Sequence, residues 1–304
     1  MEFNFLNNDE LAVLKMRGLF EEQGYKKYKV SRFEEYKLYL ENQSFLPDKH
    51  VITFTDLDGK LLALKPDATL SIIKNTNPSY DAPEKLYYSE NIYRVNKESR
   101  TFREINQKGL EYMGRIGNNE AAEVLSLAAK SLSVISSSCV LAVSHMGLIT
   151  SLISEVTDDP TVAKQILNLI SKKNSHELST LADEVGFDAR KLTDFISVHG
   201  DFEDAIDKLT DISDSPEYLA AVNELRILSE GYTASDCRFI IDVTVVNDAE
   251  FYNGILFRGY IAGVPRPILS GGRYDNVMKK MGKNADAIGF AIYLNELERS
   301  LENA

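Results

Sequence analysis

The sequence is poor in the residues that build disulfide frameworks and metal sites. Its 304 residues contain only two cysteines, Cys139 and Cys237, which lie far apart and form no Cys-x-x-Cys pair. The four histidines are scattered and form no His-Glu-x-x-His motif, so no metal site is indicated. We expect no cofactor, and we expect a cytoplasmic location because free thiols are typical of a reducing compartment.

The sequence also contains fewer basic than acidic residues. Lys and Arg number 34 against 46 Asp and Glu, which gives a net charge of −12. This balance argues against broad electrostatic binding to a phosphate backbone, tRNA included, or to an anionic membrane. The first residues lack a basic segment followed by a long apolar run, so a signal peptide is not predicted.

One uncharged stretch, between Lys130 and Glu155, is long enough to cross a bilayer. Serines, His145 and Gly147 interrupt its apolar residues. We therefore predict the end of a helix, a strand over 139–143 and the start of another helix rather than a membrane span.

The remaining pattern predicts an α+β fold. Strand-like segments surround Asp58-Gly59, a pair typical of a type I′ hairpin. Further strands are expected over 86–95, 102–113, 238–246, 251–262, 268–270 and 287–291, and helices after Asn8, over 118–135, over 274–281 and at the C-terminal end. Residues 146–232 read as a helical insertion. An antiparallel sheet flanked by helices follows from this order.

Two segments carry candidate functional residues. In the first, Arg94, Gln107 and Glu111 fall on predicted paired strands and would point into one cleft, although a solvated hairpin fits the same pattern. The second contains Gly271-Gly272-Arg273-Tyr274-Asp275. Its two glycines permit close approach of a ligand, but such a pair also marks ordinary turns.

Together these segments resemble the class II aminoacyl-tRNA synthetases, and in particular the catalytic domain of histidyl-tRNA synthetases. The resemblance runs from Leu64-Lys65-Pro66-Asp67-Ala68-Thr69, through the Arg94 hairpin and Phe251-Tyr252-Asn253, to Gly271–Asp275. It implies a class II synthetase-like antiparallel sheet flanked by helices over 1–304, with the helical insertion inside it and a self-associating core. No counterpart of the anticodon-binding domain is expected.

The resemblance also implies a damaged nucleotide site. Arg94 and Arg103 match the arginines that hold ATP in that family. However, Asn247 stands where the family has an activating arginine, and Tyr293 and Glu296 replace a glycine and an arginine of the last motif. Losing one preorganised positive group costs about 3 kcal/mol of transition-state stabilisation, so we expect very poor adenylation.

The amino-acid side of the site matches the family better. The resemblance assigns histidine binding to Asp67, Thr69, Gln107, Glu111 and Tyr252. Carboxylates suit an ammonium group and an imidazole N–H because charge-assisted hydrogen bonds are the stronger kind.

A retained histidine site beside a damaged nucleotide site resembles the regulatory subunits of ATP phosphoribosyltransferase. This resemblance implies a non-catalytic partner of a short catalytic subunit in a hetero-oligomer, with histidine as feedback effector. One alternative is a truncated histidyl-tRNA synthetase-like enzyme that activates histidine with ATP. Another is a scaffold without ligand binding.

Overall fold

The computed structural model describes residues 8–46, 49–96, 99–233, 236–246 and 251–294. The helices are α1 (Asn8–Glu22), α2 (Tyr36–Glu41), the 3₁₀ helix η1 (Gln43–Phe45), α3 (Ala68–Asn75), α4 (Asn118–Ile135), α5 (Met146–Val156), α6 (Pro160–Ser171), α7 (Ser175–Val185), α8 (Arg190–Ser197), α9 (Phe202–Thr210), α10 (Pro216–Gly231) and α11 (Asp275–Lys280). The strands are β1 (Lys26–Lys27), β2 (Phe33–Glu35), β3 (Thr53–Thr55), β4 (Leu61–Leu64), β5 (Glu84–Val95), β6 (Phe102–Gly114), β7 (Cys139–His145), β8 (His199–Asp201), β9 (Arg238–Asp242), β10 (Ile255–Ile261), β11 (Leu269–Arg273) and β12 (Asp286–Tyr293).

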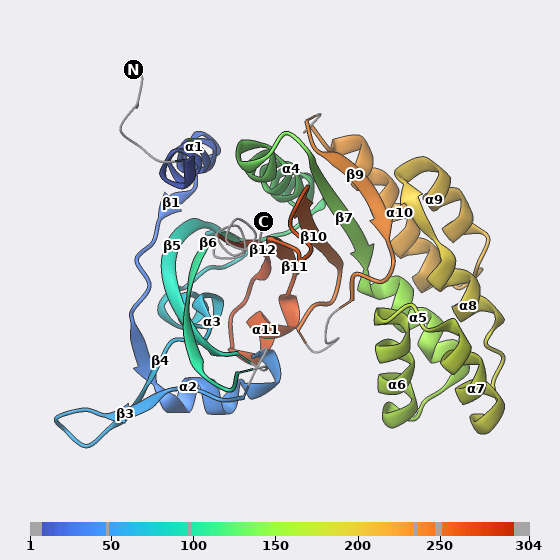
Figure 1. Cartoon of the computed structure of the whole chain (residues 1–304), viewed down its shortest axis with the longest axis horizontal. Helices are drawn as coiled ribbons and strands as arrows, with labels where there is room; N and C mark the ends of the chain where they lie inside the picture. Colours follow the sequence, from blue (N-terminus) through green and yellow to red (C-terminus); the bar gives the residue numbers. More distant parts are fainter. Residues whose placement is uncertain (1–7, 47–48, 97–98, 234–235, 247–250, 295–304) are drawn as a thin grey trace.

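A nine-stranded sheet organises the molecule, in the order β1-β5-β6-β12-β11-β10-β7-β9-β8 (Figure 1). Its centre, from β5 to β7, is antiparallel as predicted, and long pairs such as β5–β6 hold it together. Two pairings toward its edges are parallel: β1 with β5, and β7 with β9. The sheet is therefore mixed. The second parallel pair arises because the helical region between β7 and β9 supplies a long crossover connection.

Two hydrophobic cores cover the two faces of this sheet. Leu110 and Tyr112 of β6 belong to a core that also contains residues of α1, α4 and the helical region. Met113 of the same strand, together with Tyr88 and Ile92 of β5, belongs to a second core with α3 and α11. Side chains alternate between the two faces of a strand, so alternate residues of β5 and β6 separate the two cores.

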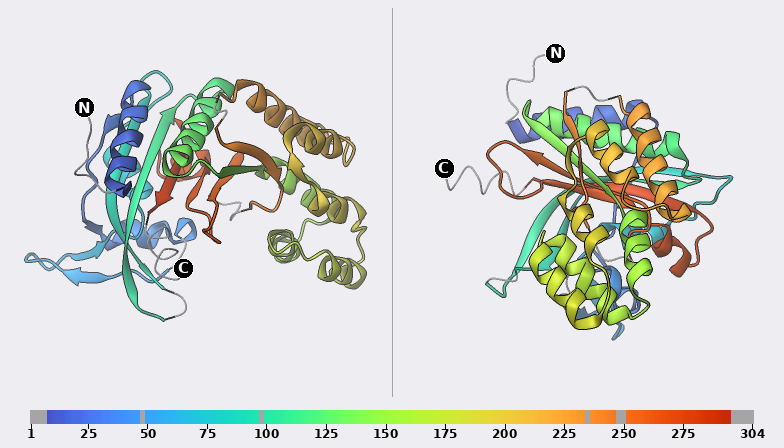
Figure 2. Two further views of the ribbon diagram at one scale, coloured as in Figure 1. Left: turned by 45° about the horizontal axis from the view of Figure 1, so that its top comes forward. Right: turned by 90° about the vertical axis from the view of Figure 1, so that its right-hand side faces the viewer.

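The helical region 146–231 lies beside β7 and β9, away from β5 and β6 (Figures 1 and 2). It also contributes β8 to the edge of the main sheet, a strand that the sequence analysis did not predict. Its status as a separate insertion domain stays a prediction. The uncharged stretch 131–154 is shared between α4, β7 and α5. In the part of the chain that the structure covers, none of the helices has the length and apolar character needed to cross a membrane.

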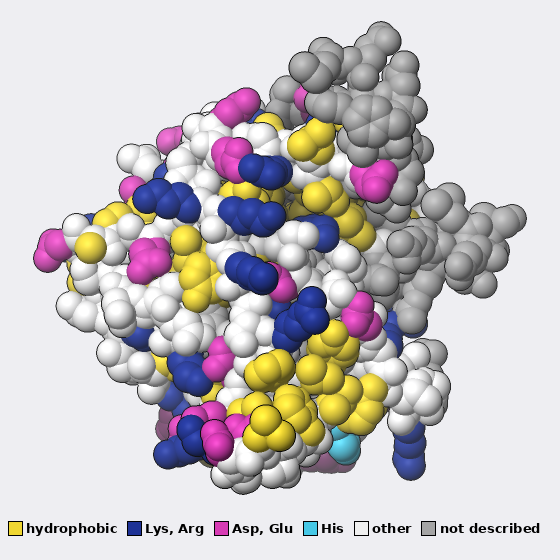
Figure 3. Space-filling view, turned by 90° about the vertical axis from the view of Figure 1, so that its left-hand side faces the viewer, with side chains coloured by type: hydrophobic (Ala, Val, Ile, Leu, Met, Phe, Trp, Pro, Cys, Tyr) yellow, Lys and Arg dark blue, Asp and Glu magenta, His cyan; other side chains and the backbone are white. Residues whose placement is uncertain are grey.

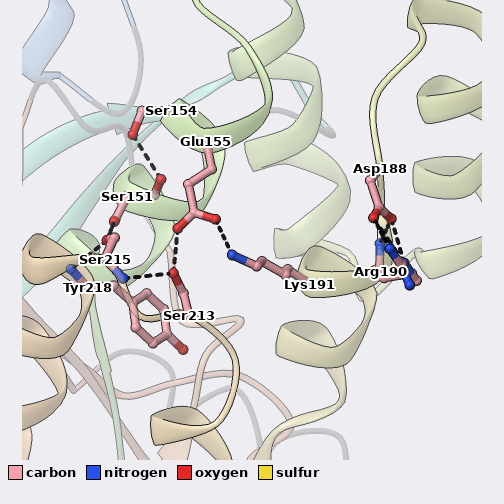
Figure 4. Close-up of polar contacts among 9 residues, drawn as sticks. All are labelled: Ser151, Ser154, Glu155, Asp188, Arg190, Lys191, Ser213, Ser215 and Tyr218. Carbon is pink, nitrogen blue, oxygen red and sulfur yellow. Dashed lines mark hydrogen bonds and ion pairs between the residues drawn. The ribbon is translucent and has the colours of Figure 1, made fainter.

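A polar network holds several helices of this region together (Figure 4). Glu155, near the end of α5, accepts hydrogen bonds from Lys191 of α8 (2.6 Å) and from Ser213 (2.5 Å). Ser215 caps α10 through the Tyr218 amide (3.2 Å) and lies 2.8 Å from the Ser151 hydroxyl of α5. These contacts fix α5 relative to the start of α10.

The predicted hairpin forms the separate small sheet β2-β4-β3 rather than the start of the main sheet. The type I′ prediction is wrong. A type I′ turn requires a positive φ at both central residues, but only Gly59 of this pair has one (81°). Instead, the Asp56 carboxylate accepts hydrogen bonds from the amides of Asp58 (2.9 Å) and Lys60 (2.8 Å). A side chain that captures local amides in this way selects the longer loop.

This small sheet and α2 leave apolar side chains exposed. Figure 3 shows apolar side chains gathered on the face from which the hairpin projects. The large exposed hydrophobic residues of these elements are Phe33, Leu40, Phe54, Leu57 and Leu61.

Two later strands are shorter than predicted. The strand after Cys237 ends at Asp242, whose carboxylate accepts hydrogen bonds from the amide (3.1 Å) and hydroxyl (2.6 Å) of Thr244 and so bends the chain. The strand predicted from Phe251 begins at Ile255. The predicted C-terminal helix lies outside the described residues.

Candidate functional site

Polar side chains gather on the α3 side of the main sheet, where α1 and α4 do not reach. We call this group the Glu111 cluster. It comprises Asp67, Thr69, Tyr88, Gln107, Glu111, Tyr252 and Tyr274. The strand β6 supplies Gln107 and Glu111, which share a face with Gly109 because they are separated by even numbers of residues.

Three glycines on adjacent strands make room for this cluster. Gly289 of β12 lies between Glu111 of β6 and Gly272 of β11 in the strand register. A Cβ at position 109 would meet the Tyr88 hydroxyl at 2.5 Å, and one at position 272 would meet the Tyr252 ring at 2.8 Å. A Cβ at position 289 would collide with Oε2 of Glu111. The glycines therefore let cluster side chains lie directly on the sheet.

Glu111 is the centre of the cluster and is 2% exposed. It accepts hydrogen bonds from the hydroxyls of Thr69 (2.7 Å) and Tyr274 (2.5 Å). Burial raises the pKa of its carboxyl to about 8; the negative charge of Asp67 contributes, and the two hydroxyl donors oppose the shift. No lysine or arginine forms an ion pair with Glu111 among the described residues. A bound cationic nitrogen would supply the positive charge that this carboxylate lacks.

Asp67 and Arg94 meet beside it. Asp67 is the N-cap of α3 and accepts a hydrogen bond from the Leu70 amide (2.9 Å). Burial raises the pKa of its carboxyl, against the opposing charge of Arg94. Arg94 lies 3.5 Å from Asp67 through Nη2 and donates from Nε to the Pro66 carbonyl (2.7 Å). Arg94, which the resemblance matches to an ATP-binding arginine, therefore contacts the two residues that precede α3.

Gln107 presents an unsatisfied acceptor. Its side-chain nitrogen donates to the Tyr88 hydroxyl (3.2 Å), whereas its buried Oε1 accepts no hydrogen bond within the described ranges. An unpaired buried polar atom costs about 1–3 kcal/mol. An amine placed against this oxygen would remove that cost.

Tyr252 completes the cluster from the segment before β10. Its ring lies on Gly272, and the pKa of its phenol is raised by burial and, to a smaller extent, by Tyr293, Glu111 and Asp67. The phenol therefore stays protonated and can donate a hydrogen bond at neutral pH.

The residues matched to the nucleotide site are only partly placed. Arg103 of β6 lies opposite Arg94 of β5, and Tyr293 of β12 lies opposite Gln107 of β6. Tyr293 packs against the second core. Asn247 and Glu296 lie outside the described residues.

The sequence analysis did not assign Tyr88, Tyr274 or Gly289 to the site. Tyr88 precedes Arg94 by six residues on one strand, and this even spacing was an available signal. Tyr274 lies within the quoted glycine motif. Gly289 gave no signal, because its role depends on its pairing with Glu111 across two strands.

The raised pKa of Glu111 predicts a pH-dependent stability. Between pH 4.5 and about 8 the Glu111 carboxyl stays protonated in the folded protein, whereas in the unfolded chain, where its pKa is near 4.5, it releases the proton. The contribution of Glu111 to the free energy of unfolding is therefore lost as the pH rises through this range. Relative to Glu111→Gln, the wild type should lose up to about 5 kcal/mol of unfolding free energy over this window. Urea unfolding at pH 5 and pH 8.5 measures this difference. Parallel pH profiles of the two proteins would contradict it.

Comparisons with known proteins place this geometry in a family. A family model described as histidyl-tRNA synthetase matches residues 6–297. A curated relative from Clostridium kluyveri, named ATP phosphoribosyltransferase regulatory subunit, is 29% identical over 94% of this chain and 76% of its own length.

Solved structures share the fold. An ATP phosphoribosyltransferase regulatory subunit/histidyl-tRNA synthetase from Bacillus halodurans superposes with a TM-score of 0.84, at 23% identity, over 97% of this chain and 79% of that one. The ATP phosphoribosyl transferase (HisG:HisZ) complex from Thermotoga maritima contains a chain that matches with a TM-score of 0.73, at 21% identity, over 96% of this chain and 98% of that one. With its class II synthetase-like sheet and a family match over nearly its whole length, this chain belongs to the histidyl-tRNA synthetase family.

Proposed function

We propose that this chain is a regulatory subunit of ATP phosphoribosyltransferase that binds histidine at the Glu111 cluster. The observation that carries the proposal is that two buried acceptors lie in the cluster. Among the residues that the structure describes, the Glu111 carboxyl has no cationic partner and the side-chain oxygen of Gln107 has no hydrogen-bond donor. Histidine offers an ammonium group and an imidazole N–H, which are the donors that these two acceptors need. The names of the relatives support the same function.

We assign the ends of the ligand from the cluster geometry together with the family resemblance. Asp67, Thr69 and Gln107 face the amine, and Glu111 and Tyr252 face the ring. A neutral carboxyl at Glu111 would lose its proton as the ligand binds, because the ammonium group beside Thr69, which contacts Glu111 (2.7 Å), is a nearby cation that favours the charged form.

We propose further that the chain does not catalyse a reaction of its own. Arg94 is held by Pro66 and Asp67, and the Tyr293 side chain occupies a position at which the family has glycine. The substitutions at Asn247 and Glu296 also remove positive charge. Phosphoribosyl transfer to ATP would then belong to the short catalytic subunit.

The partner of this chain would be that catalytic subunit, as the Thermotoga maritima complex supports for its own chains. Self-association of the synthetase-like core is a second expected contact, and the apolar surface of the small sheet supports it. Both cysteines are free and buried, which agrees with the proposed cytoplasmic location. Feedback requires that histidine bind the active and inhibited states of the complex with different affinities.

The decisive experiment measures phosphoribosyl-ATP formation by a short catalytic subunit with and without this chain, across a histidine titration. We expect the activity to depend on this chain and to fall as histidine is added. A catalytic subunit whose rate this chain does not change, and to which it does not bind, would contradict the regulatory function. Histidine-dependent ATP–pyrophosphate exchange by this chain would instead support the synthetase-like enzyme.

A further inference from the structure

Tyr252 occupies a special place between the two cores. Of the partly buried side chains in the described ranges, it alone packs against both hydrophobic cores. One core includes α5 and α10 of the helical region, and the other includes α3 and the strands beneath the Glu111 cluster. A movement of this ring would therefore change the packing of both cores.

The next residue, Asn253, is held by a reciprocal side-chain pair. Asn253 Nδ2 donates to Oδ2 of Asp275 (3.0 Å), and the Asp275 amide donates to Oδ1 of Asn253 (2.8 Å). The Asn253 amide also donates to the Arg273 carbonyl (3.1 Å). Asp275 is 4% exposed, and it accepts hydrogen bonds from Arg273 (2.8 Å) and from the Ala287 amide (3.1 Å). Asn253 is thus fixed to the junction between β11 and α11.

The residue after it, Gly254, contacts the helical region. Its carbonyl accepts a hydrogen bond from the amide of Met146 (2.9 Å), the first residue of α5. His145 caps the same helix by accepting from the Gly147 amide (3.0 Å), and its other ring nitrogen lies 3.1 Å from Glu224 of α10. Three consecutive residues therefore join the Glu111 cluster to the beginning of α5, and His145 extends the connection to α10.

We propose that the segment 252–254 transmits occupancy of the Glu111 cluster to the helical region, and that Asn253 is the positioning residue that holds this segment. The inference rests on histidine binding at the cluster. A ligand that packs on Tyr252 restricts the segment, and the restricted Gly254 carbonyl holds one of the free amides at the start of α5. A segment 252–254 that the ligand has ordered then favours an ordered start of α5. Histidine binding and the order of the helical region are therefore coupled.

Hydrogen exchange of the full chain, with and without saturating histidine, tests the link. We expect histidine to slow exchange at least threefold at residues 146–150 and across α10 in the wild type. In Asn253→Ala, histidine should still bind, although more weakly, and the slowing at both places should be lost. In Glu224→Ala, the slowing should persist at 146–150 and be lost in α10.

Asn42→Ala is the matched control, because it removes a buried asparagine hydrogen bond (to the Leu38 carbonyl, 2.8 Å) outside the segment. It should keep both the binding and the slowed exchange. Should Asn253→Ala fail to fold, Asn253→Asp replaces the donated hydrogen bond with repulsion from Asp275 and should give the same loss.

The outcomes separate the link from the proposed function. If calorimetry shows histidine binding while exchange at 146–150 does not change in the wild type, the link is wrong and the proposed function stands. Slowed exchange that persists in the Asn253 variants would overturn the role of Asn253. Absence of histidine binding would overturn the proposed function and the link together.

Discussion

Glu111→Gln is expected to weaken histidine binding by about 10- to 100-fold, because a hydrogen bond to a charged group contributes about 1.5–3 kcal/mol. With a pKa of about 8, the unliganded carboxyl is largely neutral at pH 7, so the neutral glutamine side chain resembles it in charge and shape. The substitution should therefore preserve the unliganded fold and remove only the carboxylate that the ligand induces. Calorimetric titration with histidine at pH 7 measures the loss.

The same titration across pH adds a second readout. Wild-type affinity should rise as the pH approaches 8, because less work is needed to deprotonate Glu111, and Glu111→Gln should lack this component. Glu123→Gln makes the same chemical change in α4, where Glu123 pairs with Lys85 (2.8 Å) outside both the cluster and the helical region, and it should leave histidine affinity unchanged. Equal affinities for wild type and Glu111→Gln would place the histidine site elsewhere.

Gly289→Ala is expected to destabilise the protein by about 1–3 kcal/mol, as overpacking in a buried site does, and to reduce histidine affinity at least tenfold. The added methyl group collides with Oε2 of Glu111 and with the Leu110 carbonyl oxygen of the neighbouring strand. Because the backbone oxygen cannot move far, the Glu111 side chain must leave its position. Urea unfolding and calorimetry measure the two effects.

Gly18→Ala is a matched control for this change. Gly18 lies within α1, and a Cβ there meets no atom within 4 Å. The control should gain up to about 1 kcal/mol, since alanine is the better helix former, and histidine affinity should not change. A Gly289→Ala protein that binds histidine like the wild type would show that the position of Glu111 is unimportant for the ligand.

Local signals in the sequence located most of the elements. The helix predicted over 118–135 coincides with α4, and the strands predicted over 86–95 and 102–113 lie within β5 and β6. These segments are long and have a clear apolar period, so neighbours along the chain decide their structure. The prediction was weaker at the Asp58-Gly59 turn, where the Asp56 carboxylate captures two amides, and after Asp242, whose carboxylate accepts from the amide and hydroxyl of Thr244.

The sequence by itself determined the class of fold, because periodicity and the order of the motifs are visible without the structure, and its family resemblance named most residues of the candidate site. Only the tertiary structure decided that Gly289 accommodates Glu111, that Arg94 is engaged by Pro66 and Asp67, and that Tyr252 connects two cores. These features depend on contacts between residues far apart in the chain. The pKa of Glu111 has the same origin, since burial in the assembled sheet, rather than any neighbour in sequence, raises it.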